Sequence, residues 1–331
     1  MSAAGAAGAS AGLPRLVPRG VRPDEEELLG LRRHGAVMRR VLALDDERRE
    51  GRRAPPARSQ GMDYAESRPY TPGDDVRRID WRVTARTGRA HTKVFRPEPG
   101  GDLFCLVDQR AAMRFGTRAA FKSVLAAHLA ALAGWAAVAG GERFGALIAG
   151  AQATSVPPGA SEGAVAALCA ALASEAIAAE AFDEDAGAAP LRTGTPESGV
   201  ALDRLAARAA GQAGLGTRFV VISDFAEPEA TLERAAGALR ARGELILVAV
   251  LDALEVRLPP PARYPLTDGR EQLVLDTGRA PVRAAHARDL QARRTLLARL
   301  AARPGTRCHE VRTGEDLFAA LARPFAARVA A

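Results

Sequence analysis

The sequence predicts an α/β protein with a doubly wound, mostly parallel sheet. From about residue 100 onward, short apolar runs alternate with segments that are long enough for helices. Two of the runs, LFCLVD (103–108) and RFVVISDF (218–225), are largely apolar and carry an aspartate at or near their ends, as strands buried on both faces do. Strands and helices that alternate in this way form parallel sheets covered by helices on both sides.

The same pattern predicts the other elements of this domain. Only residues 259–283 are irregular, with LVLD as a short strand among them. In chain order we expect a helix at 117–139, a strand at 143–150, helices at 161–180, 198–213 and 229–241, a strand at 244–252, a helix at 284–302, a strand at 308–313 and a helix at 314–328. Residues 100–328 are therefore expected to form one α/β domain.

The first hundred residues precede this domain. Residues 1–22 are expected to form a flexible tail, and residues 23–99 to contain a helix, a linker and a small polar segment of strand and turns. The helix (23–46) opens with acidic residues that complement its dipole. Its expected apolar face consists of Leu28, Leu31, Val37, Val41 and Leu42. The linker (47–60) is rich in Arg, Pro and Ser, and the polar segment (61–98) includes the strand-like run HTKVF.

Charge is the most unusual feature of the composition. The 331 residues carry a net charge of +7, almost all of it on arginine, since Lys93 and Lys122 are the only lysines. A basic chain raises nucleic-acid binding as an alternative function. The arginines are spread along the chain and interleaved with acids, which favours instead the codon usage of a GC-rich genome.

Several features indicate a cytoplasmic protein. The cysteines are scattered without a disulfide or metal spacing, which is typical of reduced thiols; they are Cys105, Cys169 and Cys308. No signal peptide is visible. Residues 119–141 are long enough to span a membrane, but they are mostly alanine, contain Lys122 and His128, and follow a strand, so a buried crossover helix is expected.

The carboxyl ends of the predicted strands are the first candidates for a functional site. Ligands of such sheets bind just beyond these ends. Asp108, Ser223 and Asp224 lie there. A carboxylate in such a place is costly to bury unless it is paired. The five histidines are isolated, and none accompanies a serine or cysteine in a pattern that indicates a nucleophile and its base.

The polar segment carries the most specific motif of the chain. Pro72 and Gly73 predict a turn, two aspartates follow it, and several arginines surround Asp80 and Trp81. About a dozen positions at fixed spacing resemble the signature of the domain-of-unknown-function 58 family. These positions are Tyr70, Pro72, Gly73, Asp74, Asp75, Arg77, Ile79, Asp80, Trp81, Ala85, Arg86 and Gly88.

The resemblance carries several implications. The signature of that family precedes a domain similar to the von Willebrand factor A fold, so residues 100–328 are expected to adopt it. Family members are typically encoded near MoxR-type AAA+ ATPases, which implies an adaptor in a chaperone-like system, with other von Willebrand factor A proteins as further candidate partners. Many members carry membrane helices near the N-terminus; this chain shows none and resembles the soluble branch.

The role of the signature stays open between three interpretations. An arginine–carboxylate network that docks the segment on the α/β domain is the simplest. A docking surface for a partner is the second. The third is a hydrolytic centre in which Asp74, Asp75 and Asp80 hold two metal ions. No histidine accompanies these aspartates, and the neighbouring arginines neutralise them.

The resemblance also identifies an altered metal site. In von Willebrand factor A domains, a divalent cation is held by an Asp-x-Ser-x-Ser run, a threonine and a later aspartate. Oxygen ligands suit such a hard cation. Here Asp108 is kept, but Arg110 and Ala112 replace the two serines; Thr193 or Thr195 matches the threonine, and Asp224 matches the later aspartate.

Arginine at this position opposes metal binding. A guanidinium repels even a single positive charge at 4 Å by about 4 kcal/mol at an effective dielectric constant of 20. We expect that Arg110 replaces the cation and pairs with Asp108 or Asp224. No metal is therefore expected, and Mg²⁺ would be a ligand only if the altered site still bound it.

The sequence thus predicts a non-enzymatic interaction protein with no catalytic residue and no cofactor. Its expected partner is a MoxR-type AAA+ ATPase, as the family resemblance implies. A metal-dependent hydrolase that uses the clustered aspartates is one alternative. A basic nucleic-acid-binding protein is the other.

Overall fold

The computed structural model describes residues 13–42, 44, 63–69, 79–96, 101–150, 152–185, 200–267 and 272–325. The chain divides into two compact units. Unit 1 comprises Met1–Asp45 together with Asp102–Ala331, and unit 2 comprises Asp46–Gly101.

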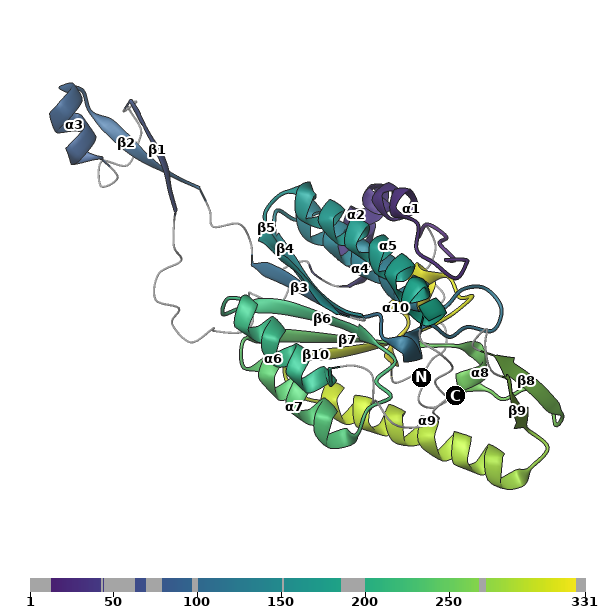
Figure 1. Cartoon of the computed structure of the whole chain (residues 1–331). Coiled ribbons are helices and arrows are strands. Elements are labelled where there is room, and N and C mark those ends of the chain that lie inside the picture. Colours follow the sequence, from purple (N-terminus) through teal and green to yellow (C-terminus); the bar gives the residue numbers. More distant parts are fainter. Residues whose placement is uncertain are drawn as a thin grey trace. The chain divides into compact units, whose positions relative to one another are not determined.

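A six-stranded sheet forms the centre of unit 1, in the order β10-β7-β6-β3-β4-β5 (Figure 1). Every neighbouring pair is parallel except β4 and β5. Counted along the chain, the order is 3-2-1-4-5-6. The strands are β3 (Asp102–Asp108), β4 (Arg143–Ala149), β5 (Ala153–Gly159), β6 (Thr217–Ser223), β7 (Gly243–Leu251) and β10 (Thr306–Arg312). The prediction of an α/β fold with a mostly parallel sheet is confirmed.

Strand β5 is the element of this sheet that the sequence pattern misses. Its sequence, ATSVPPG, holds Pro157 and Pro158, which cannot donate a backbone hydrogen bond. It lies at the edge of the sheet and pairs only with β4. An edge strand tolerates proline because one side of its backbone has no neighbour to bond. The prolines that hide β5 from a pattern search thus suit its position.

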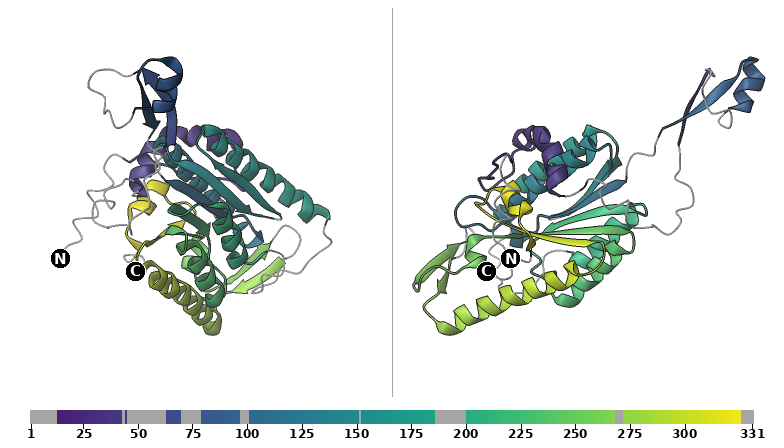
Figure 2. Two further views of the ribbon diagram at one scale, coloured as in Figure 1. Left: turned by 90° about the vertical axis from the view of Figure 1, so that its left-hand side faces the viewer. Right: turned by 180° about the vertical axis from the view of Figure 1, so that it is seen from behind.

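Helices cover both faces of the sheet (Figures 1 and 2). Alternate strand residues belong to two separate apolar clusters, one on each face. One face carries α4 (Lys122–Ala139), α5 (Glu162–Asp185) and α10 (Leu317–Ala322). The other face carries α6 (Leu202–Gln212), α7 (Glu229–Arg240) and α9 (Ala280–Ala301). Unit 1 also contains the short helices η3 (Ala111–Met113) and α8 (Ala253–Val256) and a hairpin of β8 (Arg263–Thr267) and β9 (Gln272–Asp276).

The N-terminal helix predicted at 23–46 is three short pieces that pack on α4. These are α1 (Glu25–Gly30), the 3-10 turn η1 (Leu31–His34) and α2 (Gly35–Val41). Gly35 lies so close to α4 that an added Cβ would be 2.6 Å from the carbonyl oxygen of Trp135. The Trp135 indole N–H donates to the carbonyl of Leu28 at 3.1 Å. The helix was predicted to belong with residues 23–99, whereas in the structure its three pieces belong to unit 1.

Helix α4 is the most deeply buried element of unit 1. Of the helices in the described part of the chain, it alone is long and apolar enough to cross a membrane by length and composition. Of its 18 residues, 89% are buried between the sheet and the helices that cover it. It begins at Lys122, five residues later than predicted from residue 117. This burial is the packing of a core helix.

Part of the expected tail, residues 13–22, is also attached to unit 1. The amide N–H of Leu317 donates to the carbonyl of Leu16 at 2.9 Å. Gly20 donates to the carbonyl of Ala119 at 2.9 Å and accepts from the amide of Phe121 at 3.0 Å. These backbone hydrogen bonds fix the segment beside the loop that precedes α4.

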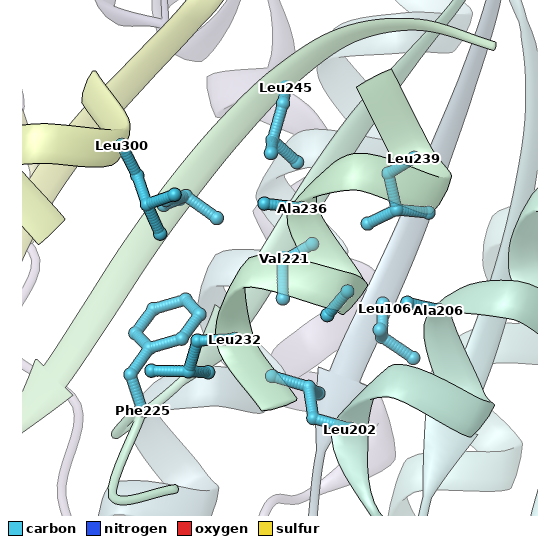
Figure 3. A pocket seen from close by; sticks show the side chains of 12 residues that line it. Leu106, Leu202, Ala206, Val221, Phe225, Leu232, Ala236, Leu239, Leu245 and Leu300 are labelled. Carbon is cyan, nitrogen blue, oxygen red and sulfur yellow. The ribbon is translucent and has the colours of Figure 1, made fainter. Parts of the chain in front are cut away.

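A small cavity lies under α6 and α7, on the α9 side of the sheet (Figure 3). Its volume of about 10 Å³ is close to that of a single water-sized probe. Its lining is entirely apolar: Leu106, Leu202, Ala206, Val221, Phe225, Leu232, Ala235, Ala236, Leu239, Leu245, Leu247 and Leu300. A space of this size without polar partners is a packing gap and not a ligand site.

Unit 2 is a hairpin with a short helix. Strands β1 (Asp63–Pro69) and β2 (His91–Arg96) pair antiparallel, and α3 (Trp81–Thr87) precedes β2. Gly88 ends α3 in the left-handed conformation, at φ 69°, which suits glycine. The strand expected from HTKVF is therefore present as β2.

Candidate functional site at the carboxyl edge of the sheet

Three aspartates lie where the strands of unit 1 end. Asp108 ends β3, Asp224 follows β6, and Asp252 follows β7. All three are buried, with exposed fractions of 2%, 4% and 0%. Strands β3 and β6 are neighbours at the point where the order of the sheet reverses, the place at which doubly wound sheets bind ligands. We call these three residues the carboxylate rim.

Asp108 is held by Arg110. The guanidinium donates from Nε to Oδ1 at 2.9 Å and from Nη2 to Oδ2 at 2.7 Å, a bidentate ion pair. The Arg110 amide donates to Oδ1 at 3.1 Å and the Ser223 hydroxyl to Oδ2 at 2.7 Å. Arg110 also donates from Nη1 to Glu227. Burial lowers the pKa of Arg110, but Asp108 and Glu227 outweigh burial and raise it, so the guanidinium stays charged.

The sequence predicted that Arg110 would pair with Asp108 or Asp224. The structure shows the first pairing; the second carboxylate bound by Arg110 is Glu227. Asp224 is instead bound by Lys122, a residue that the sequence analysis did not connect with the site.

Lys122 is an internal cation between two carboxylates. Its ammonium group donates to Asp224 Oδ2 at 2.8 Å and to Glu255 Oε1 at 2.9 Å. The side chain is only 2% exposed, and the ammonium lies 5.9 Å from the centre of the Phe115 ring. Burial lowers the pKa of Lys122, but the two carboxylates raise it above its ordinary value. For the acidic partner the signs are reversed. Burial raises the pKa of Asp224, and the nearby ammonium lowers this pKa below its ordinary value.

Asp252 is satisfied without a cation. Thr117 donates to it from its hydroxyl at 2.6 Å and from its amide at 3.1 Å. The Thr313 hydroxyl donates at 2.5 Å and the Leu254 amide at 2.9 Å. Burial raises the pKa of Asp252, but these hydrogen bonds lower it below its ordinary value. Asp252 also caps α8, where the Glu255 carboxylate accepts from the Asp252 amide at 2.7 Å, so Glu255 joins Asp252 to Lys122.

A strained backbone turn holds the loop after β6. Among the residues that the structure describes, Phe225 is the one non-glycine residue with a positive φ, at 52°. This conformation costs about 1–2 kcal/mol in a residue with a side chain. Two hydrogen bonds support it, from the Phe225 amide to Ser223 Oγ at 3.1 Å and from the Ala226 amide to Asp224 Oδ1 at 3.0 Å. The turn precedes Glu227, which reaches Arg110.

The donor set of the rim does not fit a divalent cation. The oxygens of Asp108 accept from Arg110 and Ser223, and Oδ2 of Asp224 accepts from Lys122. Ala112 contributes no oxygen from its side chain. A metal ion beside these carboxylates would be repelled by both basic groups, by about 4 kcal/mol for each pair of unit charges at 4 Å and an effective dielectric constant of 20. Within the described ranges, His, Cys, Asp and Glu form no group of three or more that could hold a metal.

The structure describes only some of the predicted site residues. Thr193 and Thr195 lie outside the described residues, and so do the signature residues Tyr70, Pro72, Gly73, Asp74, Asp75 and Arg77. Asp80, Trp81 and Arg86 are described, and all three belong to α3 or its cap. Asp80 is buried as the N-cap, whereas Trp81 is 71% exposed.

Sequence reasoning missed Lys122, Glu227 and Glu255. One signal was available for Lys122: it is one of two lysines in a strongly arginine-rich chain, and it opens a helix that is otherwise almost wholly apolar. The two glutamates carried no comparable signal. They lie more than a hundred residues from the cations that they bind, and only the fold brings them together.

Comparison with known proteins agrees with the resemblance of the signature. A family model described as "Protein of unknown function DUF58" matches residues 66–296. Uncharacterized proteins of Mycobacterium bovis and Mycobacterium tuberculosis are each 33% identical to this chain over 270 residues, which is 81% of this chain and 80% of the relative. The match extends from β1 of unit 2 through most of the sheet of unit 1 and into α9. The chain therefore belongs to the DUF58 family.

Proposed function

We propose that this chain is a non-enzymatic adaptor that acts with a MoxR-type AAA+ ATPase and docks partners at a rim that works without metal. The observation that carries this proposal is the pair of internal cations, Arg110 and Lys122, which hold Asp108 and Asp224. The link to the ATPase comes from the family resemblance. We place the protein in the cytoplasm, because its three thiols are free and buried.

The topology of the sheet supports a von Willebrand factor A-like fold with a degenerate metal site. The strand order is 3-2-1-4-5-6, with the third strand antiparallel. In the fold that the chain resembles, a metal ion at this edge accepts a carboxylate from the partner. Here the guanidinium and the ammonium fill that electrostatic role from within the chain, and neither leaves an open coordination position. A partner at this rim would therefore have to bind by shape and apolar contact.

The surface beside Arg110 has the composition for such contact. Ala111 and Ala112 are exposed, and Val200 is 49% exposed. Arg110 donates to the carbonyl of Val200 at 3.4 Å, which fixes this residue beside the ion pair. The Arg110 side chain is only 14% exposed, and two carboxylates pair with it. The surface therefore offers small apolar side chains around a buried network of ion pairs.

A metal-binding measurement tests the rim. Isothermal titration calorimetry with Mg²⁺ and Mn²⁺ is expected to show no saturable binding in the sub-millimolar range for the wild-type chain. Asp224→Ala is the matched variant, because it removes a rim carboxylate. Sub-millimolar binding to the wild type that is absent in Asp224→Ala would contradict the proposal of a metal-free rim and favour the hydrolase alternative.

A binding measurement with the purified MoxR-type ATPase of the same genome tests the adaptor role. Val200→Glu and Ala112→Glu place a charge on the proposed face and are expected to weaken binding. Leu215→Glu is the control, because Leu215 is an apolar residue that is 82% exposed at another place on unit 1, before β6. If the wild-type chain does not bind the ATPase, the partnership is wrong; if all three variants bind like the wild type, the rim is not the docking face.

A further inference from the structure

Helix α3 of unit 2 is fixed to β2 along its inner side. Asp80 caps it through hydrogen bonds from the amides of Arg82 and Val83, both at 3.2 Å. The amide of His91 donates to Thr84 Oγ1 at 3.1 Å, and the amide of Asp80 donates to the carbonyl of His91 at 2.8 Å. These contacts hold the short helix in one orientation, so its outer side is a defined surface.

The outer side combines one large aromatic residue with arginines. Trp81 is 71% exposed, the highest exposure of an aromatic side chain in the part of the chain that the structure describes. Arg82, Ala85 and Arg86 are exposed as well, and Arg89 follows just after the helix. Residues spaced by four, such as 81 and 85 or 82 and 86, are neighbours on one side of a helix. They form a single surface, which we call the α3 face.

The arginines of the α3 face are exposed and basic without a described counter-charge. Some exposed arginines of unit 1 lie against carboxylates, as Arg234 does against Asp203 and Arg299 against Glu229. Within the described residues, Arg82 and Arg86 pair with no carboxylate, and α3 itself contains no acidic residue. Like charges four residues apart on a helix repel each other. This arrangement becomes favourable when an acidic surface lies opposite.

We propose that the α3 face binds an acidic surface of a partner protein, with the Trp81 indole as the apolar anchor and the arginines as ion-pairing groups. Tryptophan and arginine are the residues that most often dominate the affinity of protein interfaces. The planar guanidinium pairs with a carboxylate in two parallel hydrogen bonds. This surface belongs to unit 2, and the inference does not depend on the function proposed for the rim.

The geometry favours a protein partner over nucleic acid or a membrane. Proteins that bind single strands stack successive bases on several aromatic rings, and the α3 face offers one. A protein on duplex DNA can make six or more phosphate contacts with its basic side chains. Helix α3 has seven residues, and only two of them are arginines, so it is too short to supply that number. Helices that lie on membranes carry a long apolar face, and Trp81 is the one large apolar side chain on this surface.

The test uses the full chain and a fluorescein-labelled peptide of repeated Glu-Glu-Leu-Phe units, followed by fluorescence anisotropy. Binding is expected, and it weakens as NaCl is added. Trp81→Ala is expected to weaken it roughly 30-fold, and Arg82→Gln/Arg86→Gln at least about tenfold. The control Arg208→Gln/Arg242→Gln removes the same charge from two exposed arginines of unit 1 and should change binding less than about twofold.

Tryptophan fluorescence gives a second readout of the wild-type chain. Only Trp81 is open to a collisional quencher, because the other tryptophan, Trp135, is 5% exposed. The peptide is expected to protect Trp81 from iodide, whereas a Gln-Gln-Leu-Phe peptide of the same length does not. The proposal is overturned if the acidic peptide does not bind or if the control variant loses as much affinity as Arg82→Gln/Arg86→Gln. Protection of Trp81 by oligothymidylate or by phosphatidylglycerol vesicles at least equal to that by the acidic peptide overturns it too.

Discussion

Replacing Lys122 with methionine removes the internal cation of the rim and leaves two carboxylates behind. Methionine keeps much of the side-chain volume, but Asp224 and Glu255 lose the ammonium that lies 2.8 Å and 2.9 Å from their oxygens. Removing one partner of a buried ion pair costs about 3–5 kcal/mol. Because Glu255 is 25% exposed and can regain water, we expect the lower end, about 3 kcal/mol of unfolding free energy.

A second variant separates the charge effect from packing. Lys122→Met/Asp224→Asn removes the ammonium and the more buried of the two carboxylates, and buried pairs replaced by neutral groups often retain stability. We therefore expect the double variant to be more stable than Lys122→Met. Urea denaturation of the wild type, both single variants and the double variant gives the coupling between the two residues. Arg208→Met, at an exposed arginine, is the control and should change stability by less than about 0.5 kcal/mol.

The effect of Lys122→Met should also depend on pH. The pKa of Asp224 is lowered in the fold, so its contribution is present above its unfolded value of about 3.9 and is lost as pH falls through the folded pKa. The pKa of Lys122 is raised, so its contribution is present below about 10.4 and is lost as pH rises through the folded pKa. The pair thus stabilises the wild type fully between about pH 5 and 10.

In Lys122→Met, burial without a cation raises the pKa of Asp224, and protonation relieves the buried charge. The difference in stability from the wild type should therefore shrink as the pH is lowered. A penalty below about 1 kcal/mol at neutral pH, or one that is the same at pH 5 and pH 8, would refute the internal-cation reasoning.

Three further predictions concern other buried groups. Arg294 forms a bidentate pair with Glu310 at 2.9 Å and 2.8 Å between α9 and β10. Because Arg312 also pairs with Glu310, at 2.9 Å, Arg294→Met should lower the unfolding free energy by about 3 kcal/mol, the lower end for a buried pair, in urea denaturation; a loss under about 1 kcal/mol contradicts this. Burial lowers the pKa of His309 to about 4, so NMR titration should find the imidazole neutral at pH 6. As the pH falls from about 6.5 toward 4, up to about 3 kcal/mol of unfolding free energy should be lost, because the unfolded chain binds a proton that the folded chain does not. A titration midpoint near the ordinary value of about 6.5 would contradict the prediction. Gly35→Ala should lower the unfolding free energy by about 1–3 kcal/mol, because the added methyl group meets the carbonyl oxygen of Trp135. An unchanged melting temperature would contradict this prediction and mean that α2 can move away from α4 without cost.

The N-terminal helix shows how far the sequence pattern reaches. The apolar face was predicted from a continuous helix and included Val37 and Val41. In the structure Leu28, Leu31 and Met38 are buried, whereas the two valines are only partly buried. The buried positions 28, 31, 35, 38 and 42 follow one another at spacings of three or four residues, the spacing of a single helix face, in spite of the turn η1. Val37 and Val41 do not fall on this spacing, so their prediction as residues of the buried face is wrong.

The rim was predictable where its contacts are local. Asp108 and Arg110 are two residues apart, so the chemistry of the run was enough to suggest an ion pair before the fold was known. Lys122 and Asp224 are 102 residues apart, and Lys122 and Glu255 are 133 apart. Which cation meets which carboxylate depends on strand order and on where α4 begins, and neither is encoded in a short motif.

An internal cation and a bound metal ion have different consequences for partner binding. A metal ion can leave, so docking through it depends on the metal concentration and on a carboxylate from the partner. Arg110 and Lys122 are covalently part of the chain, and carboxylates of the same chain already pair with them. A partner bound at the rim should therefore be indifferent to chelators and only weakly sensitive to salt. The arginines of the α3 face, which pair with no carboxylate in the part of the chain that the structure describes, imply the opposite dependence on salt. Measuring one partner's affinity with increasing NaCl would assign its binding to one of the two surfaces, and a loss of affinity in EDTA would contradict a metal-free rim.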